Sequence, residues 1–237
     1  MNKELNIFQA ALRLAPYFLG YKPQQTQTQN QKPTLTEKDI ALINLRRKDG
    51  AVIVVLGTID TGKTELCYRL AEFLDKPTYA VSPQQKPPSW IEWIKLDEIF
   101  EKVKPDSTLI CDDLPAYASN RDYNEALVKQ LERITPMVRH DPQPPEFPTG
   151  RLHLIFASQS SAQSDKHMTT GVEAAFFKPL GLLFEDLERP NIKKIYTEYV
   201  NPIFDGKSLD WVRRHAYMWS REFRGLIKVE KTTRQDY

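Results

Sequence analysis

The residues Gly57-Thr58-Ile59-Asp60-Thr61-Gly62-Lys63-Thr64 match the pattern GxxxxGK followed by Ser or Thr, which is the pattern of a phosphate-binding loop, or P-loop. The segment before it, AVIVVL at 51–56, is a continuous apolar and mostly β-branched run, typical of a strand buried on both faces of a parallel sheet. The segment 63–74 after it predicts a helix. Because a P-loop requires this order of strand, loop and helix, we expect a nucleotide site here rather than a glycine turn without function.

The chemistry of phosphate binding gives each part of the loop a predicted task. Backbone N–H groups of the loop wrap the phosphates, and the positive N-terminal end of the following helix faces them. We expect Lys63 to reach the β and γ phosphates and the Thr64 hydroxyl to bind Mg²⁺, so the predicted ligands are ATP and Mg²⁺. The residues expected to bind the nucleotide are Gly57, Thr58, Asp60, Thr61, Gly62, Lys63, Thr64 and Glu65.

A second apolar segment ends in carboxylates that suit the same site. Residues 107–111 predict a strand that runs directly into Asp112 and Asp113. We expect Asp112 to hold Mg²⁺ through water, and Asp113 to be the catalytic base that polarises the attacking water. The alternative for both is an acidic strand end without function.

A third apolar segment, 152–157, predicts a strand that ends at Ser158 and Gln159. In P-loop ATPases with a strand inserted between the two motifs, the polar side chain at the end of that strand is directed at the γ-phosphate. Gln159 fits this catalytic position better than Ser158. A residue of a surface loop is the alternative.

The composition of the 237-residue chain limits the remaining possibilities. Its 33 basic and 31 acidic residues leave a net charge of +2, so any nucleic-acid contact must come from local basic groups. The two cysteines, Cys67 and Cys111, fall inside expected core elements and predict small buried hydrophobes rather than a disulfide or a zinc site. We expect no transmembrane helix and no signal peptide, because neither pattern occurs in the sequence.

The chain is expected to have two parts, residues 1–33 and residues 34–237. In the first part, 4–21 predict an amphipathic helix whose apolar face runs from Ile7 to Leu19, and 22–33 predict a flexible linker without apolar residues. The second part is expected to be one α/β P-loop ATPase domain of the additional-strand type, with a mainly parallel central sheet and helices on both faces. The expected strands are 51–56, 78–82, 107–111, 152–157, 174–178, 216–219 and 225–229, and the expected helices are 36–45, 63–74, 96–103, 124–138 and 185–201, the last interrupted at Pro190.

The three strand ends, taken in this order, resemble the FtsK/HerA superfamily of DNA-pumping ATPases. The resemblance is carried by residues 57–64, 109–113 and 155–159. The segment 172–180 is similar to the one that follows the glutamine strand in that superfamily. The pieces 217–219 and 223–227 look like the closing strands of its small branch, the genome-packaging ATPases of membrane-containing icosahedral viruses.

The resemblance implies a homo-oligomeric ring, a hexamer, with double-stranded DNA in its channel. It also implies a catalytic arginine that reaches the γ-phosphate of the neighbouring subunit. Candidates are Arg139 and Arg151, which flank a proline-rich loop, and Arg121, while a solvated surface arginine is the alternative for each. The family usually has Glu where this chain has Asp113, and the shorter side chain retracts the carboxylate from the water.

Contacts with DNA phosphates would come from the loops of the channel. Lys86, Arg121 and Lys166 are the candidates for these contacts. Trp90 and Trp93 flank the first of these loops, where packing is the more common task of an aromatic residue.

The function implied by the resemblance is ATP-driven translocation of double-stranded DNA, most directly the packaging of a viral genome into a preformed capsid. Such a protein would work in the host cytoplasm or at a packaging vertex of the virion, where the N-terminal helix could contact capsid or membrane proteins. The alternatives are a related motor for phage assembly, export or conjugative transfer, and a regulatory NTP-binding switch. A small-molecule kinase is disfavoured, because no arginine-rich lid segment follows the glutamine strand.

Overall fold

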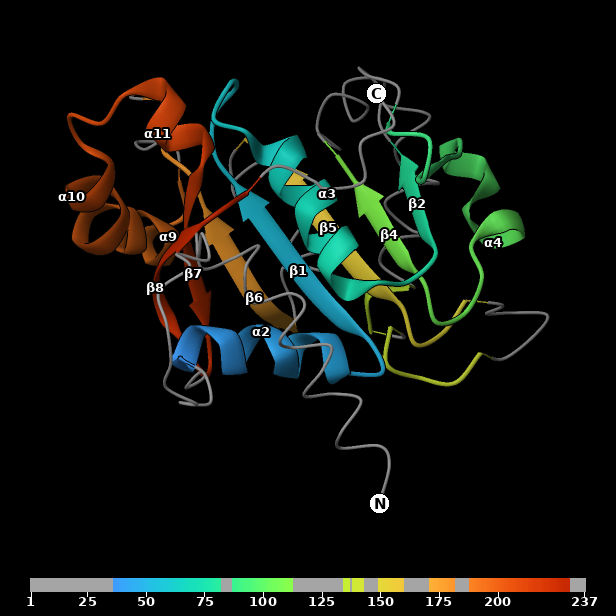
Figure 1. Cartoon of the computed structure of the whole chain (residues 1–237). Helices are drawn as coiled ribbons and strands as arrows, with labels where there is room; N and C mark the ends of the chain where they lie inside the picture. The colour runs from blue at the N-terminus through green and yellow to red at the C-terminus, as the bar shows by residue number, and fades with distance from the viewer. Residues whose placement is uncertain are drawn as a thin grey trace, which may run out of the picture.

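The computed structural model of the chain describes residues 36–81, 87–112, 134–136, 138–142, 149–159, 171–181 and 188–230 (Figure 1). The helix expected at 4–21 and most of the one expected at 124–138 lie outside these residues. No helix in this described part combines the length and the apolar composition needed to cross a membrane.

Eight strands of the described chain form one sheet, in the order β3-β2-β4-β5-β1-β6-β7-β8. The pairs from β3 to β6 are parallel, and β6–β7 and β7–β8 are antiparallel. The expected mainly parallel sheet is therefore confirmed. The strands are β1 (Ala51–Leu56), β2 (Thr78–Val81), β3 (Glu92–Trp93), β4 (Thr108–Cys111), β5 (His153–Ser158), β6 (Val172–Phe177), β7 (His215–Ser220) and β8 (Arg224–Lys228).

The central strand β1 is buried along its whole length, as its apolar run predicts. It pairs with β5 on one side and with β6 on the other, so β5 is inserted between β1 and β4. This is the predicted additional-strand order. Because the strands are parallel, the ends of β1, β4 and β5 that carry the predicted site residues lie at one edge of the sheet.

Alternate residues of β1 contribute to two separate hydrophobic cores, because successive side chains of a strand point to opposite faces. Ile53 and Val55 pack in the core that contains α2 (Glu37–Arg47) and α3 (Lys63–Leu74). Val52 and Val54 pack in the core that contains residues of the C-terminal helical segments. Helices therefore cover both faces of the sheet, as expected (Figure 1).

The helix α2 begins where its sequence predicts. The Thr36 side chain accepts a hydrogen bond from the Asp39 N–H (3.3 Å), and the Asp39 carboxylate accepts one from the Thr36 N–H (2.9 Å). This is a capping box, which satisfies backbone donors that a helix start leaves without partners. The box uses Asp39 in place of the more common Glu or Gln.

The helices expected at 96–103 and 185–201 differ from the prediction. The first is a 3-10 turn, η1 (Leu96–Glu98), followed by α4 (Ile99–Lys102). The second begins at Pro190, which suits the first turn of a helix because it lacks an N–H group. It continues as α9 (Pro190–Ile195), the π-helical turn η3 (Tyr196–Val200) and α10 (Asn201–Phe204). Pro202 has no N–H to continue the α-helical pattern, and the Asn201 N–H instead donates to the Tyr196 carbonyl.

Two elements of the structure were absent from the sequence prediction. The two-residue strand β3 adds an edge to the sheet. The short helix α11 (Leu209–Arg213) precedes β7, and Figure 1 shows it close to the loop that joins β1 to α3. Both are too short to produce a clear hydrophobic period.

Candidate functional site

The P-loop connects β1 to α3 at the carboxyl edge of the sheet. The Gly57 N–H donates to the Ser158 carbonyl at the end of β5 (3.2 Å), and the Thr58 N–H donates to the Pro179 carbonyl just after β6 (2.9 Å). The start of the loop is therefore held by the ends of both neighbouring strands. A larger side chain does not fit at Gly57, because a Cβ there would lie 2.4 Å from the Cβ of Lys178.

Gly62 is the N-cap of α3 and has a φ of 83°, in the left-handed region that glycine adopts without strain. A Cβ at this position would also lie 3.1 Å from the Arg213 carbonyl oxygen. Both glycines of the motif are thus explained by the backbone conformation and by close neighbours.

The side chains inside the loop converge on one carbonyl group. The Lys63 ammonium donates to the Thr58 carbonyl (3.0 Å), and the Thr61 hydroxyl donates to the same oxygen (2.7 Å). Lys63 is buried, so its charge is held against the loop rather than in solvent. This single contact leaves the ammonium able to bind the phosphate oxygens that a P-loop lysine contacts.

The two predicted metal ligands contact each other directly. The Thr64 hydroxyl, in the first turn of α3, donates to Oδ2 of Asp112, just after β4, over 2.6 Å. A hydroxyl and a carboxylate are the hard oxygen ligands that Mg²⁺ prefers, so these residues fit the ion. The described residues contain no group of three or more His, Cys, Asp or Glu side chains that could hold a metal. Phosphate oxygens and water are the further ligands that Mg²⁺ commonly takes at such a site.

The structure also places Gln159 at the loop. Ser158 is paired with Leu56 across β5 and β1, so Gln159 follows beside Gly57 and is partly exposed. The predicted direction of its side chain toward a γ-phosphate stays a prediction. Asp113, the predicted catalytic base, lies outside the described residues.

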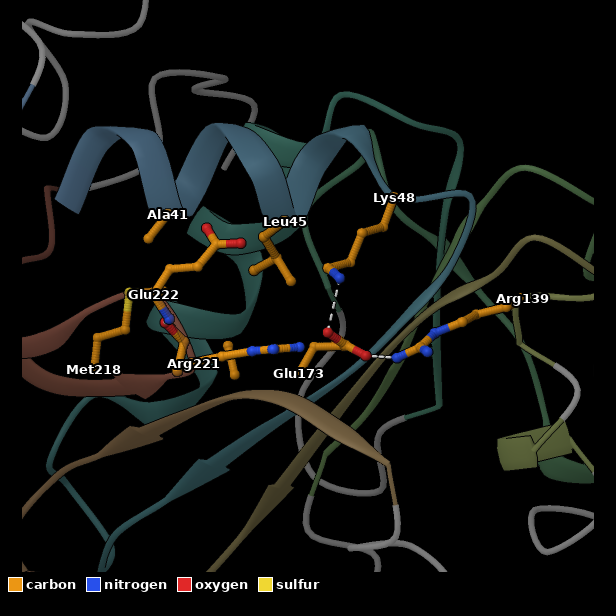
Figure 2. Close-up of a pocket in the computed structure, with 10 residues that line it drawn as sticks. Ala41, Leu45, Lys48, Arg139, Glu173, Met218, Arg221 and Glu222 are labelled. Atoms are coloured by element: carbon orange, nitrogen blue, oxygen red, sulfur yellow. Dashed lines mark hydrogen bonds and ion pairs between the residues drawn. The ribbon is translucent and has the colours of Figure 1, made fainter. Parts of the chain in front are cut away.

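The two described arginine candidates lie at the opposite edge of the sheet. Arg139 forms an ion pair with Glu173 at the start of β6, in a pocket of about 310 Å³ under α2 (Figure 2). Arg151 immediately precedes β5 and forms an ion pair with Asp106 (2.8 Å). Neither reaches the P-loop of its own chain, and a role in the site of a neighbouring subunit stays a prediction.

Three basic residues were candidates for contacts with DNA, and two tryptophans flank the first of their loops. Arg121, Lys86 and Lys166 lie outside the described residues. Trp90 packs against a hydrophobic core, as expected, whereas Trp93 is 56% exposed on the edge strand β3. The expectation that both tryptophans are packing residues is therefore wrong for Trp93, because β3 is a short outermost strand whose side chains face solvent.

The predicted character of the two cysteines is confirmed. Cys67 on α3 and Cys111 on β4 are fully buried free thiols. Burial raises the pKa of both thiols, and the Asp112 carboxylate raises it further. Both residues therefore stay protonated and act as core residues.

Two residues beside the loop were not predicted to belong to the site. Lys178 follows β6 and is fully buried, and its ammonium donates to the carbonyls of Val212 (3.1 Å) and Arg213 (2.9 Å). Burial lowers the pKa of Lys178 to about 7. Nε of Arg213 donates to the Asp60 carbonyl (3.1 Å). A lysine directly after an apolar strand was a visible signal, but Arg213 was not detectable because α11 itself was not predicted.

This fold and this loop define a P-loop NTPase of the additional-strand type. No protein-family model and no curated protein matches the chain.

Solved structures with a similar fold include the genome packaging NTPase B204 of Sulfolobus turreted icosahedral virus 2. Its complex with AMPPCP is 12% identical, with 78% of this chain and 100% of that chain covered and a TM-score of 0.45. Its complex with sulfate is 11% identical, with 77% and 98% covered and a TM-score of 0.48. A RuvB mutant of Thermotoga maritima is 14% identical, with 75% and 54% covered and a TM-score of 0.43. These likenesses concern the fold.

Proposed function

We propose that this protein is an ATPase that translocates double-stranded DNA, and that its task is to package a viral genome into a preformed capsid. The observation that carries the ATPase part is the 2.6 Å hydrogen bond between Thr64 and Asp112 beside the buried Lys63 ammonium. It joins the P-loop and the acidic strand end into one site, with the groups that Mg-ATP requires.

Within this site each residue has a defined task. Loop amides and Lys63 bind the phosphates, while Thr64 and Asp112 would hold Mg²⁺, which when bound would neutralise phosphate charge. Asp113 accepts the proton of the attacking water, and Gln159 orients the γ-phosphate from the end of β5. Burial of Asp112 and Lys63 limits the contact of their charges with bulk water, which strengthens their electrostatic effect.

The DNA part of the proposal rests on the family resemblance of residues 50–230, and the insertion of β5 between β1 and β4 agrees with it. In this proposal the chains form a hexameric ring around the DNA. An arginine from one subunit completes the site of the next, and the ring works in the host cytoplasm or at a packaging vertex.

The proposal is tested by ATP hydrolysis with and without double-stranded DNA, measured together with native mass. A motor predicts a ring-sized mass and a hydrolysis rate that double-stranded DNA increases, while equal amounts of single-stranded DNA serve as the control. A monomer whose hydrolysis is indifferent to DNA would point to the regulatory switch instead.

A further inference from the structure

The P-loop packs against α11, a segment far from it in sequence. The carboxyl end of α11 lies against Gly62, where a Cβ would be in tight contact with the Arg213 backbone, 3.1 Å from its carbonyl oxygen. Nε of Arg213 donates to the carbonyl of Asp60 (3.1 Å). Asp60 has a φ of 63°, in the left-handed region. The P-loop is therefore in contact with the carboxyl end of α11, a segment that is not part of the P-loop motif.

Lys178 contacts the carboxyl end of α11 from the interior of the protein. Its side chain is fully buried, and its Nζ donates to the last carbonyls of α11, those of Val212 and Arg213. Its backbone N–H donates to the Leu56 carbonyl (2.7 Å), so the same residue is fixed to β1 directly before the loop. Burying a charged amine is unfavourable unless it gains hydrogen-bond acceptors. The acceptors here are two carbonyls of α11.

The contacts of Arg213 with the described residues use only one of its guanidinium donors. Nε is bonded to Asp60, and neither Nη atom has a hydrogen bond or ion pair with any residue that the structure describes. The side chain is exposed, and a guanidinium presents five N–H donors in a planar arrangement. A P-loop holds phosphates against its own backbone, so a cation bonded to that backbone lies within reach of them.

We propose that Arg213 is a further nucleotide-binding residue, and that Lys178 is the positioning residue that holds it beside the phosphates. The inference rests on the nucleotide-binding part of the proposed function and is independent of DNA. It assigns the carboxyl end of α11 to the nucleotide site: Lys178 fixes the Val212 and Arg213 carbonyls to the end of β1, and Arg213 adds a cation that distinguishes polyphosphates from uncharged ligands.

The test is the affinity for ATP, measured by calorimetry on the full chain. Arg213→Ala is expected to weaken ATP binding by roughly 10-fold or more, the usual effect of losing a charged hydrogen bond. Arg213→Lys should recover part of this loss. The matched control is Arg214→Ala, which removes the same charge one residue further on, from a side chain that faces Asp210. Its effect should stay below about 2-fold, as for an exposed ion pair.

A double-mutant cycle tests whether Lys178 acts through Arg213. Lys178→Met should weaken ATP binding about as much as Arg213→Ala, and adding Arg213→Ala to it should change the affinity little further. Lys178→Gln, which keeps an N–H donor, should lose less. Thermal unfolding without nucleotide shows whether each variant is folded.

Several results would overturn the proposal. Wild-type affinity in Arg213→Ala would remove Arg213 from the site, and fully additive losses in the cycle would show that Lys178 acts independently. Failure of both Lys178 variants to fold would assign Lys178 to the stability of the core. If the wild-type chain itself binds no ATP, the proposed function fails. If it binds ATP and Arg213→Ala has no effect, only this inference fails.

Discussion

At the scale of single residues, one hydrogen bond joins two segments that are 48 residues apart, Thr64 on α3 and Asp112 after β4. Both were identifiable from the sequence, because a P-loop and an apolar strand ending in carboxylates are local patterns. Lys178 and Arg213 were not, because their contacts depend on how β6 and α11 pack around the loop. Local patterns predict which residue types a site needs, whereas contacts between distant segments require the fold.

Asp113 carries the most specific chemical prediction. Asp113→Asn should leave Mg-ATP bound but slow hydrolysis by about 10²–10⁴-fold, since an amide does not accept the proton of the attacking water. Asp113→Glu should hydrolyse ATP at the wild-type rate or faster, because it extends the carboxylate toward the water. Single-turnover hydrolysis and ATP binding measured on each variant separate the two effects. Wild-type turnover in Asp113→Asn would mean that another residue is the base.

His153 predicts a pH dependence of stability. Its Nε2 lies 3.1 Å from the Leu45 carbonyl, its buried Nδ1 has no partner among the described residues, and burial lowers the pKa of His153 from 6.5 to about 4. Between these values the unfolded chain binds a proton that the native state does not. Stability should therefore fall by roughly 3 kcal/mol as the pH is lowered from about 6.5 to 4.

Urea unfolding at several pH values measures this dependence. In His153→Gln, which can still donate to the Leu45 carbonyl, the decrease over this range should be smaller than in the wild type. His140→Gln, which alters an exposed histidine, is the control and should keep the wild-type slope. An unchanged slope in His153→Gln would exclude His153 as its source.

At the scale of elements, strong local signals gave accurate boundaries. The helix α3 has the predicted bounds, Lys63–Leu74, and β1 has the predicted bounds, Ala51–Leu56. The helix predicted at 185–201 was expected to be interrupted at Pro190. In the described residues α9 begins at Pro190 and is followed by a π-helical turn at Tyr196–Val200, just before Pro202, which cannot donate a backbone hydrogen bond. Short elements such as α11 are determined by packing against the rest of the protein, so their sequences carry little signal.

The N-terminal segment gives a prediction at this scale. Residues 4–21 are predicted to form an amphipathic helix, and residues 22–33 are predicted to be a polar linker between it and the ATPase domain. We expect the helix to dock on a neighbouring subunit, on a capsid protein or on a membrane protein. A chain without residues 1–33 should therefore stay folded and bind ATP but lose ring assembly or particle association. Native mass and calorimetry measure both properties, and an unfolded truncated monomer would show that the segment belongs to the core.

At the scale of the whole molecule, the sheet order brings the site together at one edge. The ends of β4, β5 and β1 are neighbours, so Asp112, Gln159 and the P-loop meet there. The alternation of strands and helices predicted the parallel sheet. The resemblance predicted the inserted strand, but the antiparallel edge β7–β8 could be predicted only as a pair, without its place beside β6.

A shared active site between subunits makes a further prediction. One of Arg121, Arg139 and Arg151 should be needed for turnover but not for ATP binding, because it would act on the nucleotide of the neighbour. Mixing that variant with a Lys63 variant should restore part of the activity in mixed rings. If none of the three arginine variants shows such complementation, the arginine is not supplied by these residues.

The role of the P-loop in a DNA-dependent motor is tested by ATP turnover of the wild type and of Lys63→Ala, each with and without double-stranded DNA. Lys194→Ala, which removes an exposed lysine of α9, is the charge-matched control. The wild type and Lys194→Ala should hydrolyse ATP and be stimulated by double-stranded DNA. Lys63→Ala should stay at background under both conditions, because the phosphates lose their cation. Equal turnover in Lys63→Ala and the wild type would contradict the assignment of this loop as the motor's nucleotide site.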